Sequence, residues 1–196
     1  MAKKVNAEVT EQDKAEPKKI SVEEITIKTG TRPSGRVDDM SASARLTDPA
    51  VAWRFLLAGN AIFSMVSGRT GVRYTFRLSR GKPRDGDDRP PPWFLSSLVG
   101  PSNTDDYAFI ATAFAERVPG GGGERVQTVR AAKGVDPRDK RVLAVAWLID
   151  RLRRGELPAT VEFWSSGACG RCGRLLTTPE SVERGIGPEC WERMGC

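Results

Sequence analysis

Histidine is absent from all 196 residues, and its absence excludes several kinds of active site. Histidine is the commonest general base near neutral pH, so no Ser-His or Cys-His nucleophile and no HExxH metal site can form. The GxGxxG and GxxxxGK(S/T) motifs, which bind dinucleotides and phosphates, are missing as well. We therefore expect a protein that is not an enzyme and has no small-molecule substrate.

Long apolar runs are also lacking, because no segment approaches the ~20 residues that a membrane-spanning helix needs. The N-terminal stretch MAKKVNAEVTEQDKAEPKK has no apolar core of the kind found in signal peptides. We expect a cytoplasmic protein with no membrane partner, in a compartment where thiols stay reduced. The formal charge of +6, from 31 basic and 25 acidic residues, permits nucleic-acid binding without requiring it.

Composition divides the chain into three parts. Residues 1–45 are polar and almost free of aromatic side chains, which is typical of a flexible tail, although 21–28 is apolar enough to become an edge strand. Residues 46–165 contain the apolar runs of a folded domain. Residues 166–196 contain every cysteine of the chain and are expected to form a zinc-binding module.

Hydrophobic periodicity predicts a β-hairpin at the start of the folded part. The run 72–79 alternates strictly between apolar and polar residues, as a strand with one buried face does, and it follows a second apolar run at 60–67. Further strands are expected at 93–99, 107–113, 124–131 and 160–164. Turn residues separate these runs, which favours an antiparallel meander.

Two helices are predicted from their start signals. Asp48 and Pro49 are an N-cap and a first helical residue, and Asp136 and Pro137 repeat that pattern before a longer amphipathic run. The fold class is therefore α+β, with a small antiparallel β-meander and a packed helix. A C-terminal module of the treble-clef or zinc-ribbon-like type follows.

The four cysteines have the spacing of a metal site. Cys169 and Cys172 form a CxxC knuckle, and Cys190 and Cys196 supply a return pair, which together would give Zn²⁺ a tetrahedral sulfur shell. Cys190 and Cys196 point apart on a continuous helix, so Gly195 must turn the chain back in a left-handed conformation. Otherwise Cys196 is a frayed terminal thiol, and water or a carboxylate completes the site. A closed sulfur shell leaves no open position, which favours a structural role.

The stretch CGRCGRLLTTPESVERGIGPECW at 169–191 resembles a small cysteine domain of unknown function. That domain occurs in proteins of bacteriophages and other bacterial mobile elements and has the signature CxxCGRxLTxPESxxxGIGPxC. More loosely, GNAIFSMVSGRTGVRYTFRLSR and WFLSSLVGPSNTDDYAFIATAF resemble the β-rich domain that often precedes it. The resemblance implies a phage or plasmid origin, a bacterial host cell and a zinc-like site at Cys169, Cys172 and Cys190. It implies no activity, and Cys196 lies beyond the matched stretch.

The zinc module does not have the charge of a phosphate-binding finger, because its four arginines are matched by four glutamates. Six cations with no acid between them lie instead on the hairpin and the loop after it. These candidate nucleic-acid-binding residues are Arg69, Arg73, Arg77, Arg80, Lys82 and Arg84. The alternative is that they are only the solvated side of a half-buried sheet.

Two functions remain open at this point. The first is an accessory protein of a phage or mobile element that binds DNA or RNA through the arginine-rich hairpin. The second is a protein-interaction module that inhibits a host defence, as anti-CRISPR proteins do, or a regulatory complex, with a host protein or ribonucleoprotein as its partner. The concentration of positive charge on one hairpin favours the first.

Overall fold

The computed structural model describes residues 45–118 and 124–195, all within one compact unit. Apart from Arg45, the predicted tail at 1–45 lies outside the described residues, as do the possible strand at 21–28 and Cys196. In the described ranges, no helix is long and apolar enough to cross a membrane. The predicted division into a 46–165 domain and a 166–196 module stays a prediction.

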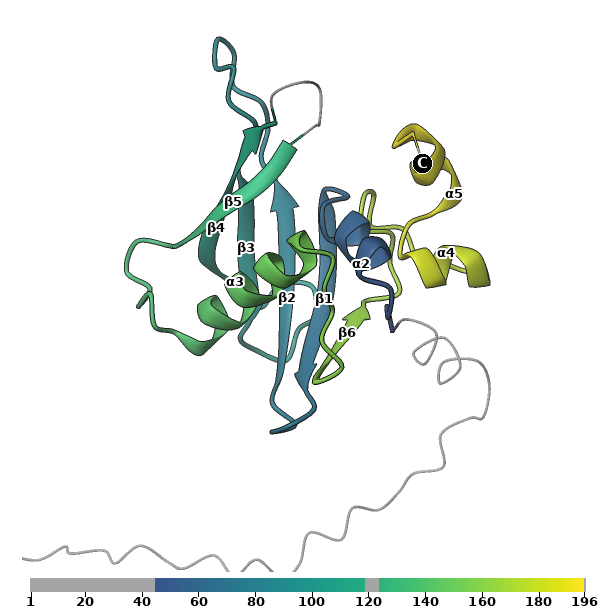
Figure 1. Ribbon diagram of the computed structural model, residues 1–196, viewed down its shortest axis with the longest axis horizontal. Coiled ribbons are helices and arrows are strands. Elements are labelled where there is room, and N and C mark those ends of the chain that lie inside the picture. The colour runs from purple at the N-terminus through teal and green to yellow at the C-terminus, as the bar shows by residue number, and fades with distance from the viewer. Residues whose placement is uncertain (1–44, 119–123, 196) are drawn as a thin grey trace, which may run out of the picture. The chain divides into compact units, whose positions relative to one another are not determined.

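One antiparallel sheet of six strands forms the centre of the structure (Figure 1). Its strands lie in the order β5-β4-β3-β2-β1-β6, so the first five follow one another as the predicted meander and the last returns beside the first. The strands are β1 (Asn60–Ser67), β2 (Arg73–Arg80), β3 (Trp93–Leu98), β4 (Tyr107–Arg117), β5 (Glu124–Ala131) and β6 (Val161–Ser165). The α+β class is confirmed.

Alternation along β2 decides which face of the sheet is buried. Phe76 and Leu78 are buried, and Phe76 lies opposite Phe63 of β1, so these side chains share the core face. Arg73 and Arg77 alternate with them and therefore lie on the other face. Because the period is two residues, a slip of one position would bring the arginines into the core.

Two helices cover the core face. α2 (Pro49–Leu56) begins as predicted, since Asp48 Oδ1 accepts hydrogen bonds from the amides of Ala50 at 2.7 Å and Val51 at 3.1 Å. α3 (Lys140–Arg153) connects β5 at one edge of the sheet to β6 at the other and buries five apolar side chains on the way. Both helices lie on the same side of the strands (Figure 1). Among the described residues no helix covers the opposite side, which we call the helix-free face.

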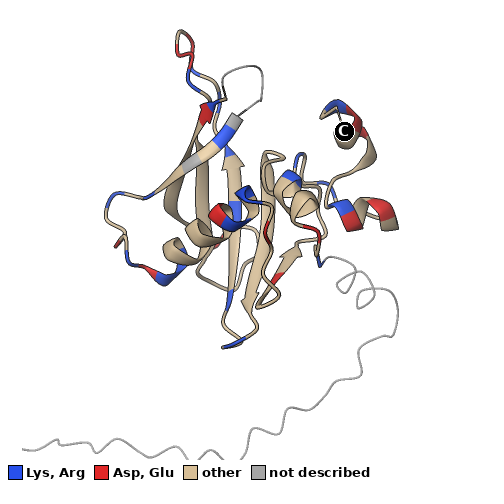
Figure 2. Cartoon of the chain, viewed as in Figure 1, with Lys and Arg blue, Asp and Glu red and all other residues tan. Residues whose placement is uncertain are grey.

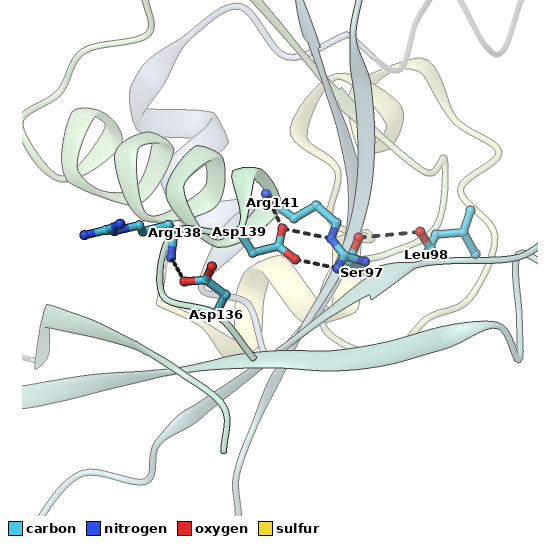
Figure 3. A network of polar contacts seen from close by, with 6 residues as sticks. All are labelled: Ser97, Leu98, Asp136, Arg138, Asp139 and Arg141. Carbon is cyan, nitrogen blue, oxygen red and sulfur yellow. Dashed lines mark hydrogen bonds and ion pairs between the residues drawn. The ribbon is translucent and has the colours of Figure 1, made fainter. Parts of the chain in front are cut away.

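The predicted start of the longer helix was wrong by several residues. Asp136 does accept a hydrogen bond from the Arg138 amide at 2.8 Å, but that bond closes a separate turn. The helix begins at Lys140, with Asp139 as its N-cap (Figure 3). Asp139 accepts from the backbone amide of Arg141 at 2.8 Å and from its guanidinium at 2.6 and 3.0 Å. Asp139 therefore accepts from a backbone amide and from a charged guanidinium, whereas Asp136 accepts from the Arg138 backbone amide.

Replacing Asp139 by alanine is expected to destabilise the protein by about 1 kcal/mol or more, because the helix loses its cap and Arg141 its partner. Asp136→Ala is the matched control and should cost less than about 0.5 kcal/mol. Urea denaturation measures both. An Asp136 variant at least as destabilised as the Asp139 variant would contradict the observed helix start.

The cap at Asp139 should also make the stability of the fold depend on pH. The side-chain hydrogen bond from Arg141 lowers the pKa of Asp139 from 3.8 to about 2. A depressed carboxyl pKa stabilises the fold above the unfolded value, so this contribution is complete above about pH 4 and is lost as the pH falls toward about 2. The stability difference between the wild type and Asp139→Ala should therefore shrink over that interval.

Candidate metal centre and basic sheet face

Three of the four cysteines lie together after β6. The sulfur atoms of Cys169, Cys172 and Cys190 are all within 4.8 Å of one another. The first two lie in a tight turn closed by a bridge between Ala168 and Leu175. Two short helices follow, α4 (Pro179–Arg184) and α5 (Pro188–Arg193), and the second carries Cys190 in its first turn. The order along the chain is therefore a knuckle, a short pairing and two short helices.

Backbone amides surround the buried Cys169 sulfur. The Gly187 amide donates to it at 3.4 Å, which places the Gly185–Pro188 segment directly beside the knuckle. Burial alone would raise the pKa of Cys169, but hydrogen bonds from the amides of Cys172, Gly187 and Arg171 outweigh burial and lower it. The amides therefore favour the thiolate form, which is the form that binds a metal.

The half-buried Cys190 has the opposite tendency. Burial, together with hydrogen bonds with the thiols of Cys172 and Cys169, raises the pKa of Cys190 to about 11. Negative charge at the first sulfur opposes a second charge nearby. A positive ion between the sulfurs would remove that opposition.

The three sulfur atoms fit a metal ion. Zinc–sulfur bonds of about 2.3 Å in a tetrahedral shell place the sulfurs about 3.8 Å apart, which the observed spacing allows. In the ranges that the structure describes, no carboxylate joins the three sulfurs. The predicted fourth ligand, Cys196, lies outside those ranges. Gly195 does take the left-handed conformation predicted for it, with φ of 70°.

A phenylalanine of α2 holds the cysteine turn against the sheet domain. Phe55 is fully buried, and its ring packs edge-on against Phe163 of β6 with centroids 6.1 Å apart. A Cβ at Gly170 would lie 2.8 Å from the ring of Phe55, and one at Gly185 would lie 2.5 Å from it. Both residues must therefore be glycine if the chain is to approach the ring this closely.

Backbone hydrogen bonds reinforce that contact. The amide of Asn60, at the start of β1, donates to the carbonyl of Gly170 at 2.6 Å, and the Gly170 amide donates to Gly185 at 2.9 Å. Trp191 of α5 receives the guanidinium groups of Arg54 and Arg184 over its ring, at 5.4 and 5.0 Å. Sequence analysis did not predict the contact of the cysteine turn with Phe55.

The six predicted nucleic-acid-binding cations lie along β2 and in the loops at both its ends (Figure 2). Arg69 is exposed in the β1–β2 turn, and Lys82 and Arg84 are exposed in the β2–β3 loop. They form a line along one strand and not a compact cluster. Figure 2 also shows mixed charge on α4 and α5, as the count of arginines and glutamates predicted.

Two of the six are held by neighbours on the helix-free face. Arg73 is exposed and donates to Ser64 Oγ at 3.1 Å, so its head lies toward β1. Arg77 is half-buried, donates to the carbonyl of Thr104 at 2.9 Å and stacks 4.2 Å from the ring centroid of Tyr107. Burial raises the pKa of Tyr107 although Arg77 lowers it, so the ring under the guanidinium is neutral. Arg80 alternates with these residues and shares the face of Phe76 and Leu78, where it stacks at 5.4 Å on the buried Trp93.

The helix-free face carries exposed aromatic side chains that sequence reasoning missed. Phe94, Phe109 and Phe114 are each 41–46% exposed, on β3 and β4. The sequence position of Phe94 could have indicated its exposure, because Phe94 lies in a strand between the buried Trp93 and Leu95. A bulge in the pairing of β3 with β4, between Leu95 and Ser96, hid the corresponding alternation around Phe109.

Comparison with known proteins identifies only the cysteine segment. Residues 163–195 match a family of unknown function (DUF6011), so the chain carries a C-terminal domain of that kind with a three-cysteine cluster in it. This agrees with the resemblance seen at 169–191. No curated protein and no solved structure matches the chain.

The contact with Phe55 is testable by substitution at Gly185. Gly185→Ala places a side chain at a φ of 68° and against the ring, and we expect it to lower the free energy of unfolding by about 2–5 kcal/mol. Gly167→Ala is the control, because Gly167 has φ of 76° and open space around it, and should lose only about 1–2 kcal/mol. Equal losses by urea denaturation would contradict the close approach to Phe55.

Proposed function

We propose that this protein is a non-enzymatic, nucleic-acid-binding accessory protein of a phage or mobile element, with a structural zinc ion in its C-terminal domain. The resemblance of 169–191 to a phage cysteine domain supports the origin. The line of cations along β2 supports the nucleic-acid partner. The structure around the cysteines supports the role of the metal.

The donor set favours zinc. Three clustered thiols are soft ligands, and zinc is the common ion in tetrahedral sulfur sites. The residues beside the sulfurs hold the chain together, because Gly170 and Gly185 pack on Phe55 of the sheet core and Trp191 packs on the small core around Cys169. When bound, the ion would supply a cross-link between the knuckle and α5, which a module of this size needs for stability.

Zinc analysis of the purified protein should give one ion per chain. Cys172→Ser removes a sulfur without disturbing the buried core, since Cys172 is exposed, and should lose the ion on dialysis against a weak chelator. Leu175→Ala, at a neighbouring exposed position, is the control and should retain it. Full retention by Cys172→Ser would contradict a metal site at the three sulfurs.

Cys196 is proposed as the fourth ligand. Cys196→Ser should weaken zinc affinity at least tenfold and change the visible spectrum of the cobalt-substituted protein from that of four sulfurs to that of three. An unchanged spectrum would show that another group completes the site.

One observation carries the nucleic-acid proposal. Arg73 lies on the helix-free face with exposed cations beyond both ends of its strand, and among the described residues neither Arg73 nor Lys82 has an ion-pair partner. Unpaired cations in a line can follow a phosphate backbone and release its counterions. Arg77 is already engaged with Tyr107, so it is better regarded as part of the sheet than as a free phosphate contact.

Salt dependence tests this interface. The variant Arg73→Glu/Lys82→Glu/Arg84→Glu should lower the slope of log affinity against log salt by about 2–3, because each lost phosphate contact removes about 0.7–0.9. The control Lys133→Glu/Arg138→Glu/Lys140→Glu makes the same charge change at exposed positions near the start of α3. It should leave the slope close to that of the wild type.

Equal slopes for the two triple variants would contradict binding through β2. A protein with no salt-sensitive affinity for DNA or RNA, which instead forms a stoichiometric complex with a host protein, would favour the protein-interaction function.

A further inference from the structure

The helix-free face carries a row of exposed aromatic rings. Phe94 and Phe109 meet edge to face with centroids 6.0 Å apart, and Phe114 lies five residues beyond Phe109 on β4. Five residues of strand span about 16 Å, so the three rings occupy a stretch of that length. Exposed large apolar side chains gathered in one place indicate a binding surface more often than chance exposure does.

Cations border this row. Arg130 of β5 lies 5.3 Å from the ring centroid of Phe114, and Arg77 and Arg73 of β2 lie on the same face across β3. Two acidic residues also lie on the described part of this face. Glu162 is on the edge strand β6, where Arg45 pairs with it at 3.3 Å, and Glu116 lies two residues beyond Phe114 on β4, opposite Arg125. The row of rings therefore has arginines on both sides, with one glutamate beside Phe114.

We propose that this face binds single-stranded nucleic acid, with unpaired bases stacked on Phe94, Phe109 and Phe114 and phosphates on the exposed arginines Arg73 and Arg130. The inference rests on the proposed nucleic-acid function and names its substrate class. Aromatic rings stack on any base, and arginine binds phosphate. The two kinds of side chain therefore match the bases and the phosphate backbone of a single strand. The guanidinium of Arg130 can share the base at Phe114, because guanidinium planes also stack on bases.

The width of the sheet excludes a duplex from the same contacts. Six strands spaced ~4.8 Å apart are about 24 Å wide, whereas the major groove of B-DNA is about 12 Å wide. The rings cannot reach base faces that are already stacked within a duplex. A duplex could contact only the cations and would gain nothing from the phenylalanines.

Fluorescence anisotropy with the full chain tests the inference. The probes are a labelled oligothymidine, a labelled oligouridine of the same length, and a duplex of mixed sequence, each with about 20 nucleotides per strand, which exceeds common single-strand site sizes. We expect both single strands to bind at least tenfold more tightly than the duplex at equal salt. A preference between oligothymidine and oligouridine would identify DNA or RNA as the better ligand.

Substitution of the rings separates stacking from folding. Phe94→Leu and Phe109→Leu keep an apolar side chain but remove the ring, and each should weaken single-strand binding about 5- to 150-fold. Phe109→Trp keeps an aromatic ring and should therefore keep the affinity for single strands close to that of the wild type. Trp147→Leu is the control, because Trp147 is 36% exposed on α3, on the covered side of the sheet. It should leave the affinity unchanged.

Two results would overturn the inference, and they differ in what they say of the proposed function. Tight, salt-sensitive binding that ignores both the ring substitutions and strandedness would leave nucleic-acid binding standing and remove the stacking face. Binding of this kind is also expected if residues 1–44 or a protein partner, and not nucleic acid, occupies that face. No affinity for any probe would reject the proposed function together with the inference.

Discussion

The close approach of two glycines to Phe55 is the contact on which the C-terminal part of the structure depends. The ring is buried between α2 and β6, and the knuckle and the Gly185 turn lie directly against it. Any side chain at either glycine would push the cysteine turn away from the sheet. Because the Asn60 amide also donates to Gly170, the position of the sulfur cluster is fixed by the start of β1 as well. The cysteine turn and the sheet are therefore joined by backbone hydrogen bonds and by one aromatic ring.

The two faces of the sheet have different physical roles. The face under α2 and α3 is filled with apolar side chains, including a row of tilted rings in contact from Phe163 through Phe63 to Phe76. That packing supplies the stability. The helix-free face has polar contacts, exposed rings and arginines, and it is therefore free to bind a partner without loss of the core. A basic surface and a cysteine cluster can coexist on one chain because the arginines lie on the sheet and the cysteines lie beyond its edge strand β6.

Local signals predicted much of this fold. The alternation of β2, the cap at Asp48 and the CxxC turn each depend on a few neighbouring residues, so they could be predicted from the sequence. The start of α3 could not, since Asp136 and Asp139 are both suitable caps and only the side chain of Arg141 decides between them. The contact of Gly170 and Gly185 with Phe55 could not be predicted either. Glycine indicates that something approaches closely, but more than a hundred residues separate Phe55 from that turn.

Amide hydrogen exchange at Asn60 tests most directly whether the cysteine turn and the sheet form one structure. Asn60 lies in β1, yet its amide hydrogen bond ends on the carbonyl of Gly170 in the knuckle. When a chelator removes the proposed zinc ion, we expect the Asn60 and Gly170 amides to lose protection together, while the amides of Phe76 and Leu78 in the sheet centre stay protected. Loss of protection at Gly170 with none at Asn60 would show that the knuckle is only tethered to the sheet, which would contradict a single structure of cysteine turn and sheet.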